Sequence, residues 1–162
     1  MTERTQQNRM KETRQVLAAE ALAPVIFDVV ENGGTFPLTV TGTSMRPTLH
    51  PHRDKVFLVS PKQRTPRKKE IVFFQRDDGA YVLHRIVGTN KTGKLKINGD
   101  AQTWTEWIQL EQVIAVVNAI ERKGKYFSVD SNKYQRFLTL WGLCRPIRKI
   151  VFSVHSFLGR GH

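Results

Sequence analysis

The residues best suited to chemistry in this chain lie in a short run around Ser44. Gly42 and Thr43 precede the serine and favour a turn, while Pro47 fixes its own φ and restricts Arg46 before it. A serine hydroxyl is a weak nucleophile at neutral pH, so it needs a base for its proton and backbone amides beside the attacked carbonyl. A stiff turn would hold such a hydroxyl in place. The same residue types also form ordinary surface turns, and that alternative stays open.

His84 is the residue that best fits the role of the base. It lies in the apolar run 81–87, directly after the turn sequence Asp77-Asp78-Gly79, so its ring should project from one strand of a hairpin. A neutral imidazole, with a pKa near 6.5, can accept a proton at pH 7 without deep burial. A histidine in a strand is often only structural, which is the alternative interpretation.

The run from Gly42 to Leu49, Gly-Thr-Ser-Met-Arg-Pro-Thr-Leu, resembles the nucleophile motif of the type I signal peptidase superfamily, which includes the self-cleaving SOS repressors. Further stretches follow in the order found in that family: Asp54-Lys55-Val56, Glu70-Ile71-Val72-Phe73-Phe74, Leu83-His84-Arg85-Ile86-Val87 and Asn98-Gly99-Asp100. The similarity covers residues 36–121. It implies a serine endopeptidase that removes a leader or signal-like peptide, with Ser44 as the nucleophile.

The resemblance also implies roles for His84 and Asp100. The base is a lysine in bacterial signal peptidases and in the repressors, but no lysine lies between Lys69 and Lys91 here. The segment around His84 is instead similar to the His-Arg-Val context of the endoplasmic-reticulum and archaeal branch. Asp100 resembles the aspartate that orients the histidine in that branch, and Glu106 is a weaker candidate for the same role. An Asn-Gly-Asp turn also forms for conformational reasons alone.

Backbone support for an oxyanion is expected from Gly42, Thr43, Ser44 and Met45. Bacterial signal peptidases carry a serine at the position of Gly42, and its hydroxyl helps to bind the oxyanion. Loss of one such donor costs about two to three orders of magnitude in rate, so we expect a modest rate here. The chain also departs from membrane signal peptidases because no transmembrane anchor precedes the serine motif.

Composition bounds the remaining chemistry. The chain has 162 residues, a formal net charge of +12 and a sequence pI near 10.3, so a partner or surface of negative charge is plausible. A single cysteine, Cys144, excludes an internal disulfide, and the five histidines have no companion cysteines at zinc spacing. We therefore expect no metal and no cofactor.

Four segments are expected along the chain. Residues 1–14 are polar and basic and predict a flexible tail. Residues 15–34 predict an amphipathic helix, with Leu22, Val25, Ile26 and Val29 on one face; Pro24 is a potential break, and the apolar run of 16–30 is too short for a membrane span. Residues 35–130 alternate short apolar runs with turns, which predicts a mainly β peptidase-like domain, a coiled antiparallel sheet or partial barrel.

The fourth segment, residues 131–162, predicts a basic amphipathic helix packed on or beside that domain. Its apolar stripe would also suit peripheral contact of residues 145–160 with an anionic membrane surface. Without an anchor or a signal sequence, the default location is cytoplasmic, and the expected substrate is a peptide or protein bound in extended conformation.

A binding module is the alternative to an enzyme. Too few residues precede Phe36 for the helical unit of a DNA-binding repressor, so we expect no DNA-binding domain. A catalytically inactive protein that uses its basic surface for anionic lipid or nucleic acid remains open, because basic charge also serves as ordinary solvated surface.

Overall fold

The computed structural model describes residue 10 and residues 19–143. These residues form a mainly β structure in which eight strands make one antiparallel sheet. In chain order the elements are a helix described over residues 19–31, β1 (Phe36–Thr39), β2 (Asp54–Val59), β3 (Ile71–Gln75), β4 (Tyr81–Thr89), β5 (Leu95–Asn98), β6 (Glu106–Ile108), the short 3-10 helix η1 (Leu110–Gln112), β7 (Val113–Arg122), β8 (Lys125–Ser128) and α2 (Asn132–Leu143).

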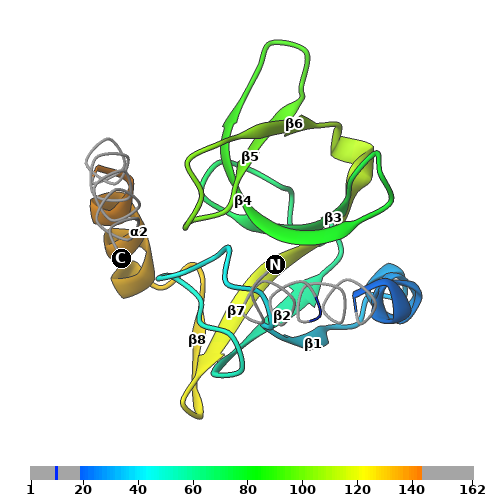
Figure 1. Cartoon of the computed structure of the whole chain (residues 1–162). Helices are drawn as coiled ribbons and strands as arrows, with labels where there is room; N and C mark the ends of the chain where they lie inside the picture. The colour runs from blue at the N-terminus through cyan, green and yellow to red at the C-terminus, as the bar shows by residue number, and fades with distance from the viewer. Residues whose placement is uncertain (1–9, 11–18, 144–162) are drawn as a thin grey trace. The chain divides into compact units, whose positions relative to one another are not determined.

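Strand β7 lies at the centre of the sheet. The strand order is β1-β2-β7-β3-β4-β5-β6, and β8 also pairs with β7. Residues 116–122 of β7 pair with β2, and residues 113–116 pair with β3. Val116, where the two ranges meet, pairs with both Val59 and Val72. From β3 to β6 the chain curls into an arc (Figure 1). The two strands that begin and end this order, β1 and β6, each pair along one edge only among the residues that the structure describes.

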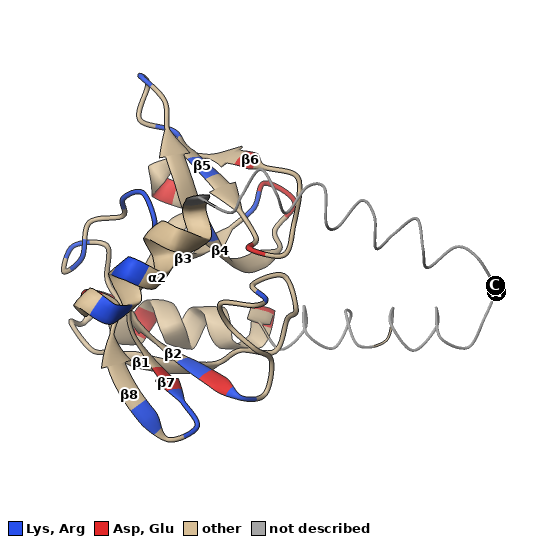
Figure 2. Ribbon diagram, turned by 90° about the vertical axis from the view of Figure 1, so that its left-hand side faces the viewer, with Lys and Arg blue, Asp and Glu red and all other residues tan. Residues whose placement is uncertain are grey.

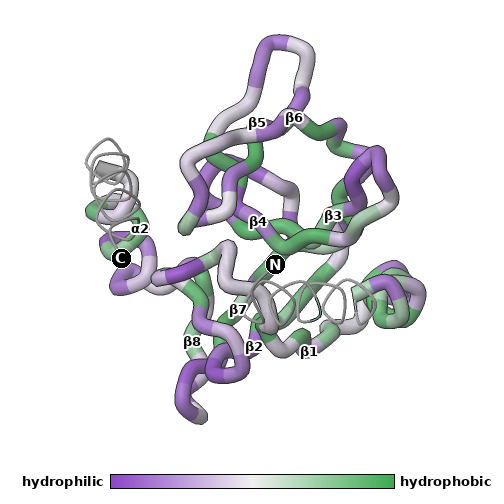
Figure 3. The backbone as a smooth tube through the Cα atoms, in the orientation of Figure 1, coloured by the Kyte–Doolittle hydropathy of each residue, from purple (hydrophilic) through white to green (hydrophobic). Residues whose placement is uncertain are grey.

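Two hairpins are present, and the first is the one expected from the turn sequence Asp77-Asp78-Gly79. β3 pairs with β4 across the turn that contains Gly79, whose φ is 88°. β7 joins β8 through Lys123 and Gly124, with φ values of 51° and 73°, as a two-residue turn between twisted strands requires. The strands β3 and β7 are largely hydrophobic, whereas this second turn is hydrophilic (Figure 3). The period-two pattern thus predicted the strands well, but β6 was not predicted.

The N-terminal helix buries a different set of residues from the set expected. Ala23, Ile26 and Val30 are buried, while Leu22 and Val25 are 37% and 50% exposed. The buried positions are three and four apart, as one helical face requires, and Pro24 does not interrupt the described helix. The expected face was therefore displaced by about one residue.

The described residues divide between Phe127 and Ser128 into two compact units. In the second unit, α2 places Tyr134, Phe137 and Trp141 in contact along one side, with ring centroids 6.4 and 6.5 Å apart for successive pairs. A helix here agrees with the amphipathic helix expected from residue 131 onward. Within the described residues no helix is both long enough and apolar enough to cross a lipid bilayer. The segment 145–160, expected to contact membranes, lies outside the described residues, as does the expected tail 1–14 apart from residue 10.

Candidate active site

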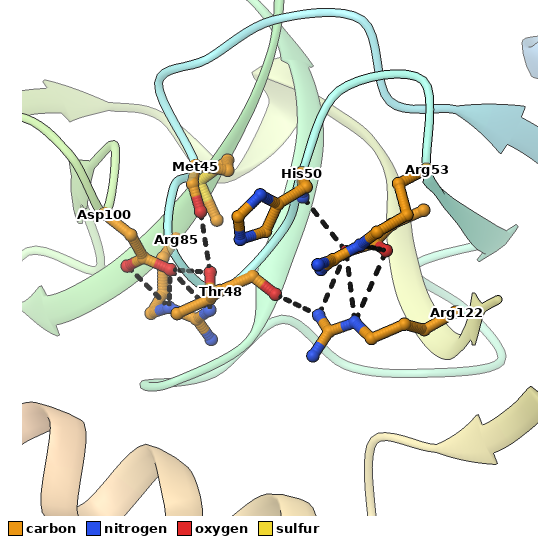
Figure 4. A network of polar contacts seen from close by, with 8 residues as sticks. Met45, Thr48, His50, Arg53, Arg85, Asp100 and Arg122 are labelled. Carbon is orange, nitrogen blue, oxygen red and sulfur yellow. Dashed lines mark hydrogen bonds and ion pairs between the residues drawn. The ribbon is translucent and has the colours of Figure 1, made fainter.

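Ser44 lies in the serine loop, which we define as residues 40–53 between β1 and β2. One side of this loop is held by a buried polar network centred on Thr48 (Figure 4). The Thr48 side chain hydrogen-bonds to Asp100, and its hydroxyl lies 2.9 Å from the carbonyl oxygen of Met45. Arg85 donates from Nε and Nη2 to Asp100, at 2.9 Å to Oδ1 and 2.7 Å to Oδ2. Since Thr48, Arg85 and Asp100 are all at most 6% exposed, this network is a rigid support for the loop.

The other side of the serine loop is held by Asp54 at the start of β2. The Asp54 side chain is buried, accepts a hydrogen bond from the His50 amide at 3.0 Å, and pairs with Arg53 and Arg122. Burial alone would raise the pKa of Asp54, but the hydrogen bonds from Arg53, Arg122 and the His50 amide outweigh it and lower the pKa to about 2. Arg122 also donates to the Thr48 carbonyl oxygen. Loop and strand are thereby joined through ionised groups.

The Asn98-Gly99-Asp100 turn packs directly on the nucleophile segment. The Ala101 amide donates to the Ser44 carbonyl oxygen at 2.8 Å. A Cβ on Gly99 would lie 2.9 Å from that same oxygen and 2.6 Å from Oε1 of Gln102, so the close approach requires glycine. The turn that the sequence indicated as part of the site therefore supports the serine loop.

A groove brings Ser44 and His84 together. It has a volume of about 330 Å³ and is lined by the end of β1, the serine loop, the β3–β4 hairpin and the N-terminal helix. Besides Ser44 and His84, its walls include Leu38, Gly42, Phe73, Arg76, Tyr81 and Leu83. The lining is largely apolar, and its polar residues are Ser44, His84, Arg76, Thr39, Thr41 and Gln102.

His84 lines this groove from the middle of β4. Successive side chains of a strand point to opposite faces, so its neighbour Arg85 reaches the Asp100 network instead. The ring is 2% exposed and lies beside Phe74 and Trp104, each with a centroid separation of 6.4 Å. Burial and then the positive charge of Arg76 lower the pKa of His84 to about 4, against the opposing effect of Glu106. The imidazole is consequently neutral at pH 7, and it is a weaker base than a histidine of ordinary pKa.

Glu106 supplies the carboxylate that contacts Nδ1 of His84 within the described part of the chain. Its Oε1 lies 3.7 Å from Nδ1, beyond hydrogen-bond distance, and Nδ1 is buried without a hydrogen-bond partner. Asp100, expected to orient His84, is instead engaged by Arg85 and Thr48. This geometry favours Glu106, the weaker candidate from the sequence, as the orienting group, and gives Asp100 a supporting role in the serine loop.

The backbone amides of Ser44 and Met45 are candidates for oxyanion binding. Neither amide has a hydrogen-bond partner among the described residues, and Ser44 begins a stretch of turns. Met45 itself is buried at 1% exposure and fixes the peptide that follows the serine. A Cβ on Gly42 would meet only Oγ of Ser44, at 4.0 Å. The position therefore has room for a side chain beside the nucleophile.

Two functional residues were not singled out in the sequence. Arg76 follows β3 and Thr48 lies at the end of the nucleophile motif, and both acquire their roles through partners distant in the chain. Within the described part of the chain no cluster of three or more His, Cys, Asp or Glu side chains could hold a metal ion. The expected catalytic residues Ser44 and His84 share the groove, whereas Asp100 lies behind the serine loop.

Comparisons with known proteins add no assignment. The sequence matches no protein-family model, and no curated protein matches it at a significant level. The resemblance to signal peptidases accordingly rests on the sequence motifs.

Proposed function

We propose that this protein is a serine endopeptidase of the signal-peptidase type, in which Ser44 is the nucleophile and His84 the general base. The observation that carries the proposal is that these two residues line one groove although they come from different elements. The neutral state of His84 at pH 7 supports its role as a base. The coiled sheet expected for this superfamily is part of the same proposal.

In the proposed reaction, His84 takes the proton of the Ser44 hydroxyl as the oxygen attacks a peptide carbonyl, and returns it to the leaving amine. The amides of Ser44 and Met45 would stabilise the negative oxygen of the intermediate. Because Gly42 carries no hydroxyl, this stabilisation would rest on backbone donors alone, and we expect slow turnover.

The substrate is proposed to be a leader or signal-like peptide in extended conformation. Among the described residues, strand β1 pairs only with β2, which leaves its other edge open, and its residues Leu38 and Thr39 line the groove. An extended peptide could add to that edge by main-chain hydrogen bonds. The apolar walls formed by Phe73, Tyr81 and Leu83 would then receive its side chains. A cytoplasmic site of action, expected from the sequence, belongs to this proposal.

Labelling with a fluorophosphonate, followed by mass spectrometry, tests the proposal. Wild type should carry the adduct on Ser44, and Ser44→Ala and His84→Ala should carry none. Ser128→Ala, which removes an exposed serine of β8, is the matched control and should label like wild type. Labelling of Ser44 that survives His84→Ala would exclude His84 as the base.

Absence of labelling in every variant would favour the inactive binding module instead. Lys and Arg are spread over turns and the start of α2 (Figure 2), and salt-sensitive binding to anionic vesicles or RNA would then be the expected activity.

A further inference from the structure

Arg76 is a charged group of the groove that the proposed hydrolysis does not use. It follows β3 directly and lines the groove together with Ser44 and His84. Its Nε donates to Oε2 of Glu106 at 2.7 Å and its Nη2 donates to Oε1 at 2.6 Å. The guanidinium also lies 5.5 Å from the ring centroid of Trp104. Both hydrogen bonds leave Nη1 unused, and the side chain is 25% exposed, so a second acceptor can reach it.

Glu106 lies between Arg76 and His84. The oxygen that accepts from Nη2 of Arg76, Oε1, is also the one that lies 3.7 Å from Nδ1 of His84. A hydrogen bond between them would need about 2.9 Å, so a movement of roughly 1 Å separates Glu106 from a second partner. Nδ1 is buried and lacks a hydrogen bond. The short, two-point contact with Arg76 therefore holds Glu106 away from a donor that needs an acceptor.

We propose that Arg76 recognises a carboxylate side chain of the substrate peptide, an Asp or a Glu, and that this contact releases Glu106 to accept a hydrogen bond from Nδ1 of His84. The inference rests on the proposed function and adds to it a substrate class, peptides with an acidic residue near the cleaved bond. Arg76 is then a specificity residue and Glu106 a positioning residue.

A carboxylate is the ligand that this geometry suits. The planar guanidinium offers paired N–H groups that match two carboxylate oxygens. A bound substrate carboxylate would pair with Arg76 in place of Glu106, and Glu106 would keep a hydrogen-bond donor in Nδ1 of His84. The net charge of +12 also favours approach of an acidic peptide.

The consequence for catalysis is a base that strengthens when the substrate is bound. Three charged groups act on the pKa of His84. Arg76 lowers it, and Glu106 and Asp100 raise it. Asp100 is fixed by Arg85 and Thr48, so the contact between Arg76 and Glu106 is the adjustable one. A hydrogen bond from Nδ1 to Glu106 would fix the imidazole tautomer with Nε2 free to accept the serine proton.

The first test measures the pKa of His84 by NMR and requires no substrate. Arg76→Gln should raise this pKa by at least about one pH unit, because it removes a positive charge and frees Glu106. Arg76→Lys, the matched comparison, keeps the charge but loses the two-point contact, so the pKa should rise less than in Arg76→Gln. In the double variant Arg76→Gln/Glu106→Gln most of the rise should disappear. An unchanged pKa in Arg76→Gln, or a full rise in the double variant, would overturn the release of Glu106.

The second test measures recognition in Ser44→Ala, which can bind peptides without cleaving them. Octapeptides of otherwise identical sequence, carrying Glu or Gln at one position in turn, are titrated while the His84 ring resonances are followed. At one position the Glu peptide should bind about tenfold more tightly than its Gln partner, and Arg76→Gln should abolish the difference. If the Glu and Gln peptides bind equally at every position, or if neither binds up to the solubility limit, the proposed recognition is overturned.

These outcomes are separate from those of the proposed function. If fluorophosphonate labels Ser44 but neither test succeeds, the hydrolase stands and the acidic specificity fails. If labelling fails while both tests succeed, the groove is an acidic-peptide site without the proposed chemistry.

Discussion

Mild acid should destabilise this protein through His84. Burial and the charge of Arg76 lower the pKa of His84 from 6.5 to about 4, so between these values the unfolded chain binds a proton that the native protein does not. The free energy of unfolding must therefore fall as the pH falls through this window. The difference of about 2.5 pH units, at about 1.36 kcal/mol each, corresponds to about 3 kcal/mol.

Urea unfolding of wild type and His84→Gln between pH 7.5 and 4 measures this effect. Glutamine does not titrate, so the difference between the two proteins isolates His84, and contributions of the other histidines cancel. The stability of wild type relative to His84→Gln should decrease by about 3 kcal/mol from pH 7 to pH 4. Asp54, with its pKa near 2, does not titrate in the native state over this range. A difference that is constant with pH would refute the neutral, buried state of His84.

Three other substitutions test the support of the serine loop. Gly99→Ala should cost about 1–3 kcal/mol in chemical denaturation and slow labelling of Ser44, because the added Cβ would lie 2.9 Å from the Ser44 carbonyl oxygen; full stability and labelling would contradict that packing. Asp100→Asn should lower the thermal midpoint and labelling together, since it removes the buried partner of Arg85, whereas loss of labelling alone would restore Asp100 as the orienting group of His84. Gly42→Ser has room for its side chain and should increase the labelling rate by adding a donor, and a lower rate in a stable variant would argue against oxyanion binding there.

Local signals in the sequence predicted much of this fold, and long-range contacts explain what they missed. Alternation and turn residues placed most strands, because strand period and hairpin turns are local properties. The strand β6 was missed since Glu106, Trp107 and Ile108 are too few residues to show a period. The helix face was displaced because the elements packed against the helix bury Ala23, Ile26 and Val30 rather than Leu22 and Val25, and the helix sequence alone does not specify those neighbours.

The candidate site, like the fold, was predicted from local motifs but not from long-range contacts. Ser44 and His84 were found from motifs, and the structure places both in one groove. The partner of Asp100 was not predicted. Whether Asp100 meets His84 or Arg85 depends on which face of β4 lies against the turn that contains Asp100. Arg76 and Glu106 are brought together by the curvature of the sheet from β3 to β6, and no sequence spacing encodes that pairing.

The central place of β7 also determines when the sheet can form during synthesis of the chain. The strands that flank it, β2 and β3, are synthesised well before β7, and neither pairs with the other in the sheet. Arg122, which ties the serine loop to Asp54, is the last residue of β7. A nascent chain therefore cannot complete the sheet until this strand has left the ribosome, and such non-local pairing is slow to form. Synthesis itself would thus keep the proposed hydrolase inactive until nearly the whole β domain has been made.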